Sequence, residues 1–277
     1  MKPDSQWRTF AKSIPPIYWF AGFTRYLGFR TELHRENEIY RQINPARIPP
    51  PILRYRVHRA FDQESYVANG KVISRHLVNA FIDHGVELSD RVVLDFACGP
   101  GRVISEFALA TNGCDLYGSD IDVEAITWAR SNLADVARFS TNTAAVPTDF
   151  ASDMFDAIYC VSLFTHLDEA AQNDWLAEMA RILKPGGVFV TTTHGRFAME
   201  SCTPWEKAQL QRDGFVYRVD RKGRFKVDGL PDFYQTTFHS VDYVRKNWSR
   251  FLPVVNHIEG GLNGHQDIVV MRKSETA

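Results

Sequence analysis

Two acidic residues and a pair of glycines stand where the chain could hold a charged ligand between them. Asp95 ends an apolar run, and Gly99 and Gly101 follow it in a Gly-Pro-Gly turn. Asp120 ends the next apolar run. Glycines at such a turn let the backbone approach a ligand closely, and a helix that starts there presents its amide groups. Because a carboxylate repels a phosphate, Asp95 indicates a ligand whose nearby end is positively charged.

This arrangement differs from the fingerprint of dinucleotide-binding proteins. That fingerprint needs a third small residue three positions after the second glycine, where this chain has Ile104. Asp120 is placed as the acid that binds both hydroxyls of a ribose at the end of the second strand. A nucleoside with a cationic tail in place of a phosphate satisfies both acids, and S-adenosylmethionine is such a molecule.

The segments that must position these residues alternate between strand and helix. Strands are predicted near residues 92–94, 115–119, 138–141, 155–161 and 188–192, with two closing strands near 251–255 and 267–271. Asp122, Asp168 and Ser240 are each placed to cap the helix that follows them. The alternation predicts an α/β fold with a doubly wound, Rossmann-like, seven-stranded sheet, in which ligands bind beyond the carboxyl ends of the strands.

Two regions lie outside this alternation. Residues 1–88 are rich in aromatic residues, arginine and proline, which predicts short helices that form an N-terminal cap on the domain of residues 89–277. Between residues 196 and 239, apolar side chains alternate on either side of a polar turn. This pattern predicts a β-hairpin inserted after the fifth strand, with strands near 215–219 and 225–227.

Four segments carry a resemblance to the class I S-adenosylmethionine-dependent methyltransferases. They are VLDFACGPG for the glycine-rich motif, YGSDID for the ribose motif, FDAIYCVSLFTHL for the fourth strand and RILKPGGVFV for the turn before the fifth. The resemblance covers about residues 90–195 and implies S-adenosyl-L-methionine as cofactor and S-adenosyl-L-homocysteine as product. The cofactor-binding positions that it implies are Asp95, Ala97, Cys98, Gly99, Gly101, Asp120, Ile121, Asn142, Thr143 and Ser162.

The chain departs from the family pattern at two of these positions. Ala97 stands where many members have glycine, and Asn142 stands where members often have an aspartate that contacts the adenine amine. The carbonyl of an asparagine can accept the same hydrogen bond. In the N-terminal segment, Arg54 or Arg56 could meet the carboxylate of the methionine with its planar fork, or could form surface salt bridges instead.

Histidines that follow the fourth and fifth predicted strands are candidates for a catalytic base. A sulfonium methyl group needs in-line approach and a dry pocket, and it needs a base only when the acceptor is a hydroxyl or a protonated amine. His166 and His194 could each take that proton, or each could hold a loop by a backbone hydrogen bond. His239 is a third candidate. We expect transfer to the oxygen of a small molecule, with transfer to nitrogen as an alternative.

Composition and charge limit the kinds of partner that the protein is expected to bind. The 277 residues are 44% hydrophobic and 23% charged, with a formal net charge of −1, so no general attraction to nucleic acid is expected. No apolar run is long enough for stable insertion into a membrane, and the four cysteines lack metal-site spacing. We therefore expect a cytoplasmic protein without metal. Basic residues in the insertion could attract an acidic or phosphorylated acceptor, and a homo-oligomer is compatible with the sequence.

Two other classes of function stay open at this point. A nucleic-acid or protein methyltransferase would share the fold, although the Asn/Asp-Pro-Pro-aromatic turn of enzymes that methylate exocyclic amines is replaced by Cys160–Phe164. A regulatory protein could bind the cofactor without catalysis. The acids and glycines argue for cofactor binding but do not themselves establish transfer.

Overall fold

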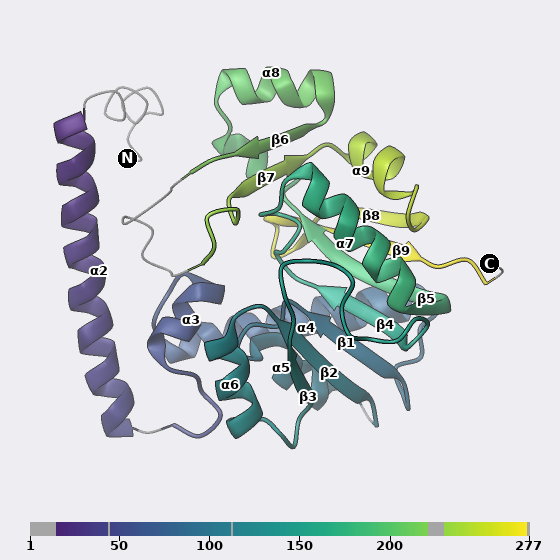
Figure 1. Cartoon of the computed structure of the whole chain (residues 1–277), viewed down its shortest axis with the longest axis horizontal. Helices are drawn as coiled ribbons and strands as arrows, with labels where there is room; N and C mark the ends of the chain where they lie inside the picture. The colour runs from purple at the N-terminus through teal and green to yellow at the C-terminus, as the bar shows by residue number, and fades with distance from the viewer. Residues whose placement is uncertain (1–14, 44, 112, 221–229, 276–277) are drawn as a thin grey trace.

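A seven-stranded sheet forms the centre of the computed structural model, which describes residues 15–43, 45–111, 113–220 and 230–275 (Figure 1). The strand order is β3-β2-β1-β4-β5-β9-β8. The strands are β1 (Val92–Phe96), β2 (Asp115–Asp120), β3 (Arg138–Thr141), β4 (Phe155–Cys160), β5 (Leu183–Thr193), β8 (Val254–Leu262) and β9 (Gln266–Arg272). The first five run parallel, and β9 lies antiparallel between β5 and β8. The predicted doubly wound sheet is confirmed, and its order reverses between β1 and β4.

Helices cover both faces of this sheet. One face packs against α4 (Gln63–Asp83), α5 (Arg102–Ala110) and α6 (Val123–Asn132), and the other against α7 (Glu169–Ile182) and α9 (Val241–Trp248). Successive strand residues point to opposite faces, so Val93 joins the first core and Leu94 the second. Asp122, Asp168 and Ser240 cap α6, α7 and α9 by accepting backbone N–H groups, as predicted.

The N-terminal region differs from the short helices that were expected. It contains α2 (Pro15–Ile43), a helix of 29 residues, followed by α3 (Pro51–His58) and then α4. The prolines of α2 and α3 lie in the first turn, where a missing N–H costs no hydrogen bond, so they begin helices instead of breaking them. In Figure 1, α2 stands to one side of the molecule. The ring of its Phe29 contacts Tyr55 and Phe61, with centroids 4.9 and 5.4 Å apart.

The closing hairpin of the sheet is longer than predicted. The turn Asn263-Gly264 has positive φ at both residues, which suits the tight connection between β8 and β9. This turn lets β8 continue through Gly260 and Gly261 with a shift in register, where the sequence had predicted a strand that ended near residue 255. None of the described helices combines the length and hydrophobicity that crossing a bilayer requires.

The insertion after β5 forms a small layer of its own, at the top of Figure 1. It contains a 3-10 turn (Ala198–Ser201), α8 (Pro204–Asp213), β6 (Phe215–Arg218) and β7 (Thr236–His239). Strand β6 pairs antiparallel with β7. The second strand predicted near residues 225–227 lies entirely in the segment 221–229, outside the described residues. A separate cluster of buried side chains holds this layer together, formed by Ala198, Cys202, Leu210, Val216 and Phe238.

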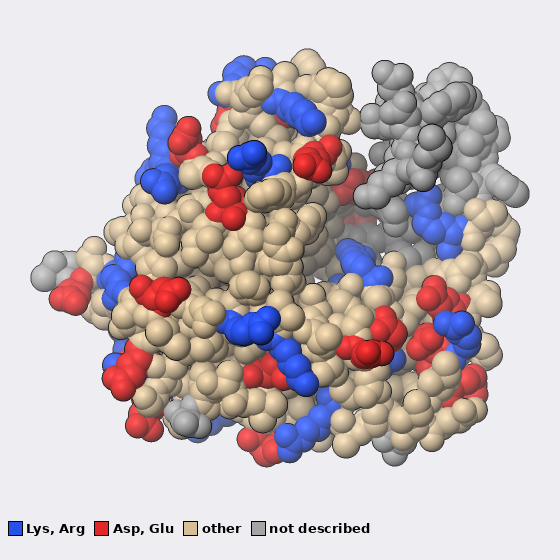
Figure 2. Space-filling view, turned by 180° about the vertical axis from the view of Figure 1, so that it is seen from behind, with Lys and Arg blue, Asp and Glu red and all other residues tan. Residues whose placement is uncertain are grey.

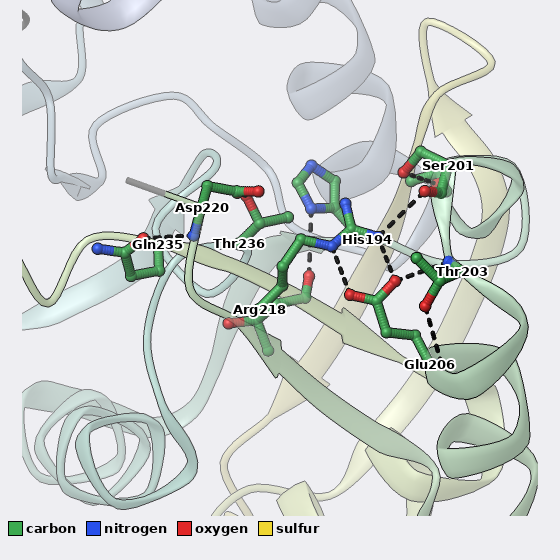
Figure 3. A network of polar contacts seen from close by, with 10 residues as sticks. His194, Ser201, Thr203, Glu206, Arg218, Asp220, Gln235 and Thr236 are labelled. Carbon is green, nitrogen blue, oxygen red and sulfur yellow. Dashed lines mark hydrogen bonds and ion pairs between the residues drawn. The ribbon is translucent and has the colours of Figure 1, made fainter. Parts of the chain in front are cut away.

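A polar network fastens α8 to β6 (Figure 3). Thr203 and Glu206 form a reciprocal cap at the start of α8. The Arg218 guanidinium donates to both carboxylate oxygens of Glu206, at 2.7 and 2.8 Å, and lies over the ring of Phe238. Burial of Glu206 acts to raise its pKa, but hydrogen bonds from Arg218 and Thr203 outweigh it and lower the pKa to about 2.

Helix α4 generates a prediction about stability. Leu77 is fully buried in the core, whereas Ile82 on the same helix is 58% exposed. Leu77→Ala should lower the free energy of unfolding by about 2–5 kcal/mol because it removes buried methyl groups and leaves a cavity. Ile82→Ala should change it by no more than about 0.5 kcal/mol. Urea denaturation of both variants checks this, and similar losses in the two would contradict the placement of α4 in the core.

The Glu206 network generates a prediction about pH. A carboxyl whose folded-state pKa is depressed stabilises the protein above its unfolded-state pKa, and that stability is lost as the pH falls through the folded-state pKa. The wild-type protein should therefore be more stable than Glu206→Gln at neutral pH, and the difference should shrink between about pH 4.5 and pH 2. Thermal unfolding of both proteins across this range checks it. A difference that stays constant would mean that the charge of Glu206 contributes nothing.

Candidate active site

A cavity of about 760 Å³ opens at the carboxyl ends of β1, β2 and β4, where the strand order reverses. Its wall also includes α3, residues 230–234 and the turn between β8 and β9. Of the residues that the sequence analysis singled out, the following line it: Asp95, Ala97, Cys98, Gly99, Asp120, Ile121, Asn142, Ser162 and His166. Gly101, Thr143 and His194 do not belong to the lining.

The turn after β1 is held in an unusual backbone conformation. Gly99 has a φ of +54°, and a Cβ atom at this position would lie 2.6 Å from Val57 of α3. Ala97 has a φ of +62°, a backbone region that residues other than glycine rarely adopt. Ser162, at the end of the neighbouring strand β4, has the same φ. Such outliers mark the place where the surrounding structure holds the backbone against its local preference.

Asp120 is oriented by the backbone on both sides. One carboxylate oxygen accepts the N–H of Gly99 at 2.7 Å, and the other accepts the N–H of Asp122 at 2.8 Å. Burial raises the pKa of Asp120, although these hydrogen bonds oppose the shift. Each oxygen keeps a second lone pair, so the carboxylate can accept two further hydrogen bonds from adjacent hydroxyl groups of a ligand.

Asp95 lies deeper than Asp120, with only 3% of its surface exposed. Its Oδ2 atom makes no hydrogen bond to the described residues. Burial raises the pKa of Asp95 well above its usual value, and the nearby Asp120 adds to this effect. A buried carboxylate oxygen without a hydrogen bond is costly, so a cationic group bound in the cavity would stabilise the charged form of Asp95.

Asn142 follows β3 and is bonded on both ends of its side chain. Its Oδ1 accepts the hydroxyl of Ser119 at 2.9 Å, and its Nδ2 donates to the carbonyl of Thr143 at 2.8 Å. These bonds fix the side chain at the cavity wall. The neighbour Ala144, instead of Thr143, completes this part of the wall.

His166 lies in the loop after β4 and forms part of the cavity wall. Its ring stacks on Tyr234, with centroids 4.0 Å apart and planes inclined by 23°. The Nδ1 atom hydrogen-bonds to the carbonyl of Gln235. Because a carbonyl can only accept, Nδ1 carries a proton, and Nε2 is the basic nitrogen of the neutral ring.

Backbone hydrogen bonds hold the insertion against this loop. The N–H of Gln235 donates to the carbonyl of His166 at 3.0 Å, and the N–H of Thr237 donates to the carbonyl of Thr165 at 2.7 Å. The hydroxyl of Thr237 also donates to the carbonyl of Leu167 at 2.6 Å. Strand β7 thereby fixes the loop that carries His166.

The other two histidines have structural partners. His194 donates from Nδ1 to the carbonyl of Thr237 at 3.1 Å, and burial, with a contribution from His265, lowers its pKa to about 4. His239 is fully buried and donates from Nε2 to Gln172 at 3.0 Å, and burial lowers its pKa to about 3. Both rings are therefore uncharged at neutral pH, and neither lines the cavity.

Of the two N-terminal arginines, Arg56 forms salt bridges, which was one of the two alternatives expected for it. Arg56 lines the cavity but pairs with Asp122 at 2.9 Å and with Glu124 at 2.8 Å, which joins α3 to the start of α6. Arg54 is buried outside the cavity, near the ring of Tyr40. Wall residues that were not predicted from the sequence include Arg102, Tyr234, His265 and Gln266.

The sequence matches known proteins over the central part of the chain. Residues 93–187 match the family model described as a methyltransferase domain. The ubiquinone biosynthesis O-methyltransferase of Stutzerimonas stutzeri is 30% identical over 139 residues, which are 49% of this chain and 58% of that protein. The enzyme of the same name from Photobacterium profundum is 28% identical over 119 residues, 42% of this chain and 49% of that one. The chain thus spans about half the length of these curated relatives.

The fold matches solved structures over a larger share of the chain. An S-adenosylmethionine-dependent methyltransferase from Mesorhizobium loti has a TM-score of 0.52 at 15% identity, over 73% of this chain and all of that one. The PH0226 protein of Pyrococcus horikoshii has a TM-score of 0.53 at 16% identity, over 79% of this chain and 98% of that one. The motifs, the strand order and these matches agree with one another. Residues 93–187 thus form a methyltransferase domain, and the chain has the Rossmann-like fold of S-adenosylmethionine-dependent methyltransferases.

Proposed function

We propose that this protein transfers a methyl group from S-adenosylmethionine to an oxygen atom of a small molecule. The observation that carries the proposal is the convergence of Asp95, Asp120 and His166 on one cavity. The two acids suit the two ends of the cofactor, and the histidine provides a base at the wall of the same cavity. The curated relatives support oxygen as the accepting atom, because both are named O-methyltransferases.

Asp95 and Asp120 bind opposite ends of the cofactor. Asp120, fixed by two backbone N–H groups, accepts the hydroxyls of the ribose. Asp95 binds the ammonium group, whose positive charge lowers the cost of keeping this buried carboxylate ionised. Asn142 and Ala144 lie at the adenine end of the wall. This placement leaves the part of the cavity beside Ser162, His166 and residues 230–234 for the acceptor.

The reaction then needs one proton transfer. As the acceptor oxygen attacks the methyl carbon, the bond from carbon to sulfur breaks and S-adenosylhomocysteine forms. The proton of the hydroxyl passes to Nε2 of His166, whose Nδ1 proton is held by the Gln235 carbonyl. Tyr234, stacked on the imidazole, keeps water away from one face of the ring.

The basic residues of the insertion bear on the charge of the acceptor. An acidic or phosphorylated acceptor was expected from the basic residues of the insertion. In the described part of that insertion, Arg212 pairs with Asp213 and Arg218 pairs with Glu206. Figure 2 shows acidic and basic side chains interspersed on the face seen from behind. Four further basic residues of that expectation lie outside the described residues, namely Arg221, Lys222, Arg224 and Lys226, so an acidic or phosphorylated acceptor stays a prediction.

The ribose assignment is tested by removing its carboxylate. Asp120→Ala should weaken binding of S-adenosylhomocysteine by about 1–3 kcal/mol, because the ribose hydroxyls lose their charged partner. Asp115→Ala makes the same change at the opposite end of β2, where Asp115 pairs with Arg138, and should leave binding unchanged. Isothermal titration calorimetry checks both. Equal affinity in the wild type and Asp120→Ala would remove Asp120 from the cofactor site.

The base is tested by a pair of matched substitutions. His166→Gln should lower turnover by about 100-fold or more with little change in cofactor affinity, because it removes a positioned base. His194→Gln should have a much smaller effect, since His194 lies outside the cavity wall. The assay follows methyl transfer from labelled S-adenosylmethionine to hydroxyl compounds that the wild type methylates. If only His194→Gln is impaired, the roles are reversed; if neither is, the acceptor is already a good nucleophile, such as a neutral amine.

A further inference from the structure

Gln235 contacts the surroundings of the candidate base through its side chain as well as its backbone. It directly precedes β7, and only 4% of its surface is exposed. Its Oε1 accepts the N–H of Asp220 at 2.9 Å, and its Nε2 donates to the carbonyl of Asp232. Exchanging the two ends of the carboxamide would place donor against donor and acceptor against acceptor, so these partners fix the orientation of the amide.

These two hydrogen bonds connect separate parts of the insertion. Figure 3 shows the bond from Asp220, which follows β6. Asp232 belongs to the segment of residues 230–234, which contributes to the cavity wall. The hydroxyl of Thr236 donates to the carboxylate of Asp220, so that end of the connection is itself held. The Gln235 side chain thus determines how the backbone at this position lies between β6 and the cavity wall.

The backbone of Gln235 contacts His166 twice. Its N–H donates to the carbonyl of His166 at 3.0 Å, and its carbonyl accepts the Nδ1 proton of the His166 ring. The preceding residue, Tyr234, stacks on the same ring with centroids 4.0 Å apart. The tautomer of a neutral imidazole is set by the hydrogen bond that one of its nitrogens makes. The placement of this backbone therefore decides which nitrogen of His166 is left as a base.

We propose that Gln235 is a positioning residue for His166. Its carboxamide holds the backbone so that the imidazole keeps its proton on Nδ1 and leaves Nε2 to take the proton of the acceptor. The inference rests on the proposed function, because it needs His166 as the base. Glutamine suits this task because it offers a donor and an acceptor on neighbouring atoms, whereas an ionised glutamate offers only acceptors and methionine only a weak one.

The test replaces the carboxamide by an apolar side chain of similar length. In the wild type at about pH 8, where an ordinary histidine ring is neutral, His166 should carry its proton on Nδ1. In Gln235→Met the ratio of the Nδ1–H to the Nε2–H tautomer should fall by roughly 3- to 10-fold, the worth of one neutral hydrogen bond. Long-range proton–nitrogen NMR spectra of the histidine-labelled protein measure this ratio, and the signals absent from His166→Gln identify the ring.

Gln211→Met makes the same exchange at an exposed position of α8 and should leave the ratio unchanged. Both variants should bind S-adenosylhomocysteine like the wild type, since Gln235 does not line the cavity. A wild-type His166 protonated on Nε2, or an unchanged ratio in Gln235→Met, would overturn the proposal. If that variant does not fold, Gln235→Glu takes its place, because it keeps the bond from Asp220 and loses only the donor to Asp232. If the ratio changes as expected but His166→Gln keeps full turnover, the proposed base fails while the role of Gln235 in orienting the ring stands.

Discussion

Asp95 lies near the carboxyl end of β1, an interior strand of the sheet, where a carboxylate has almost no contact with water. A charge in this position can be kept only if something in the cavity compensates for it. The main features of the site follow from that requirement. The glycine turn brings the backbone close to the ligand, Asp120 is tied to the same turn through Gly99, and the start of α5 supplies a positive group. The acidic and basic groups of the site are arranged to bind a charged ligand instead of pairing with one another.

The remaining elements close the cavity around this centre. Helix α3 lies so close to the turn that Gly99 has no space for a side chain. The salt bridges of Arg56 fasten α3 to α6, and strand β7 fastens the insertion to the loop after β4. A cofactor held between these parts is shielded from bulk solvent, which strengthens the electrostatic interactions that hold it.

Much of the fold could be predicted because the signals are local. Strand and helix periodicity gave the seven strands, and the capping residues Asp122, Asp168 and Ser240 marked where helices begin. The length of helix α2 could not be predicted from its prolines, because proline breaks a helix in its interior but begins one in the first turn, where Pro15 and Pro16 lie. The Asn263-Gly264 turn carried a hairpin signal that would have placed the end of β8 correctly.

The wall of the cavity was less predictable, because its residues come together only in the folded chain. Tyr234 and His265 lie far along the sequence from the motifs, and no local pattern connects them to His166. The position of Arg102 in the sequence could have marked it as a residue of the site. A cation in the first turn of a helix opposes the helix dipole, so an arginine there has reason to serve something other than helix stability.

The attachment of β7 uses mainly backbone groups of the insertion, and these are common to nearly every residue type. Within the same segment, Tyr234 stacks on the His166 ring, whereas the side chain of Phe233 is exposed at the cavity wall. Phe233 can be exchanged while the carbonyl that orients the His166 ring stays where it is. If the acceptor binds beside this segment as proposed, a substitution at Phe233 would change which acceptor is bound without moving the groups that transfer the methyl group.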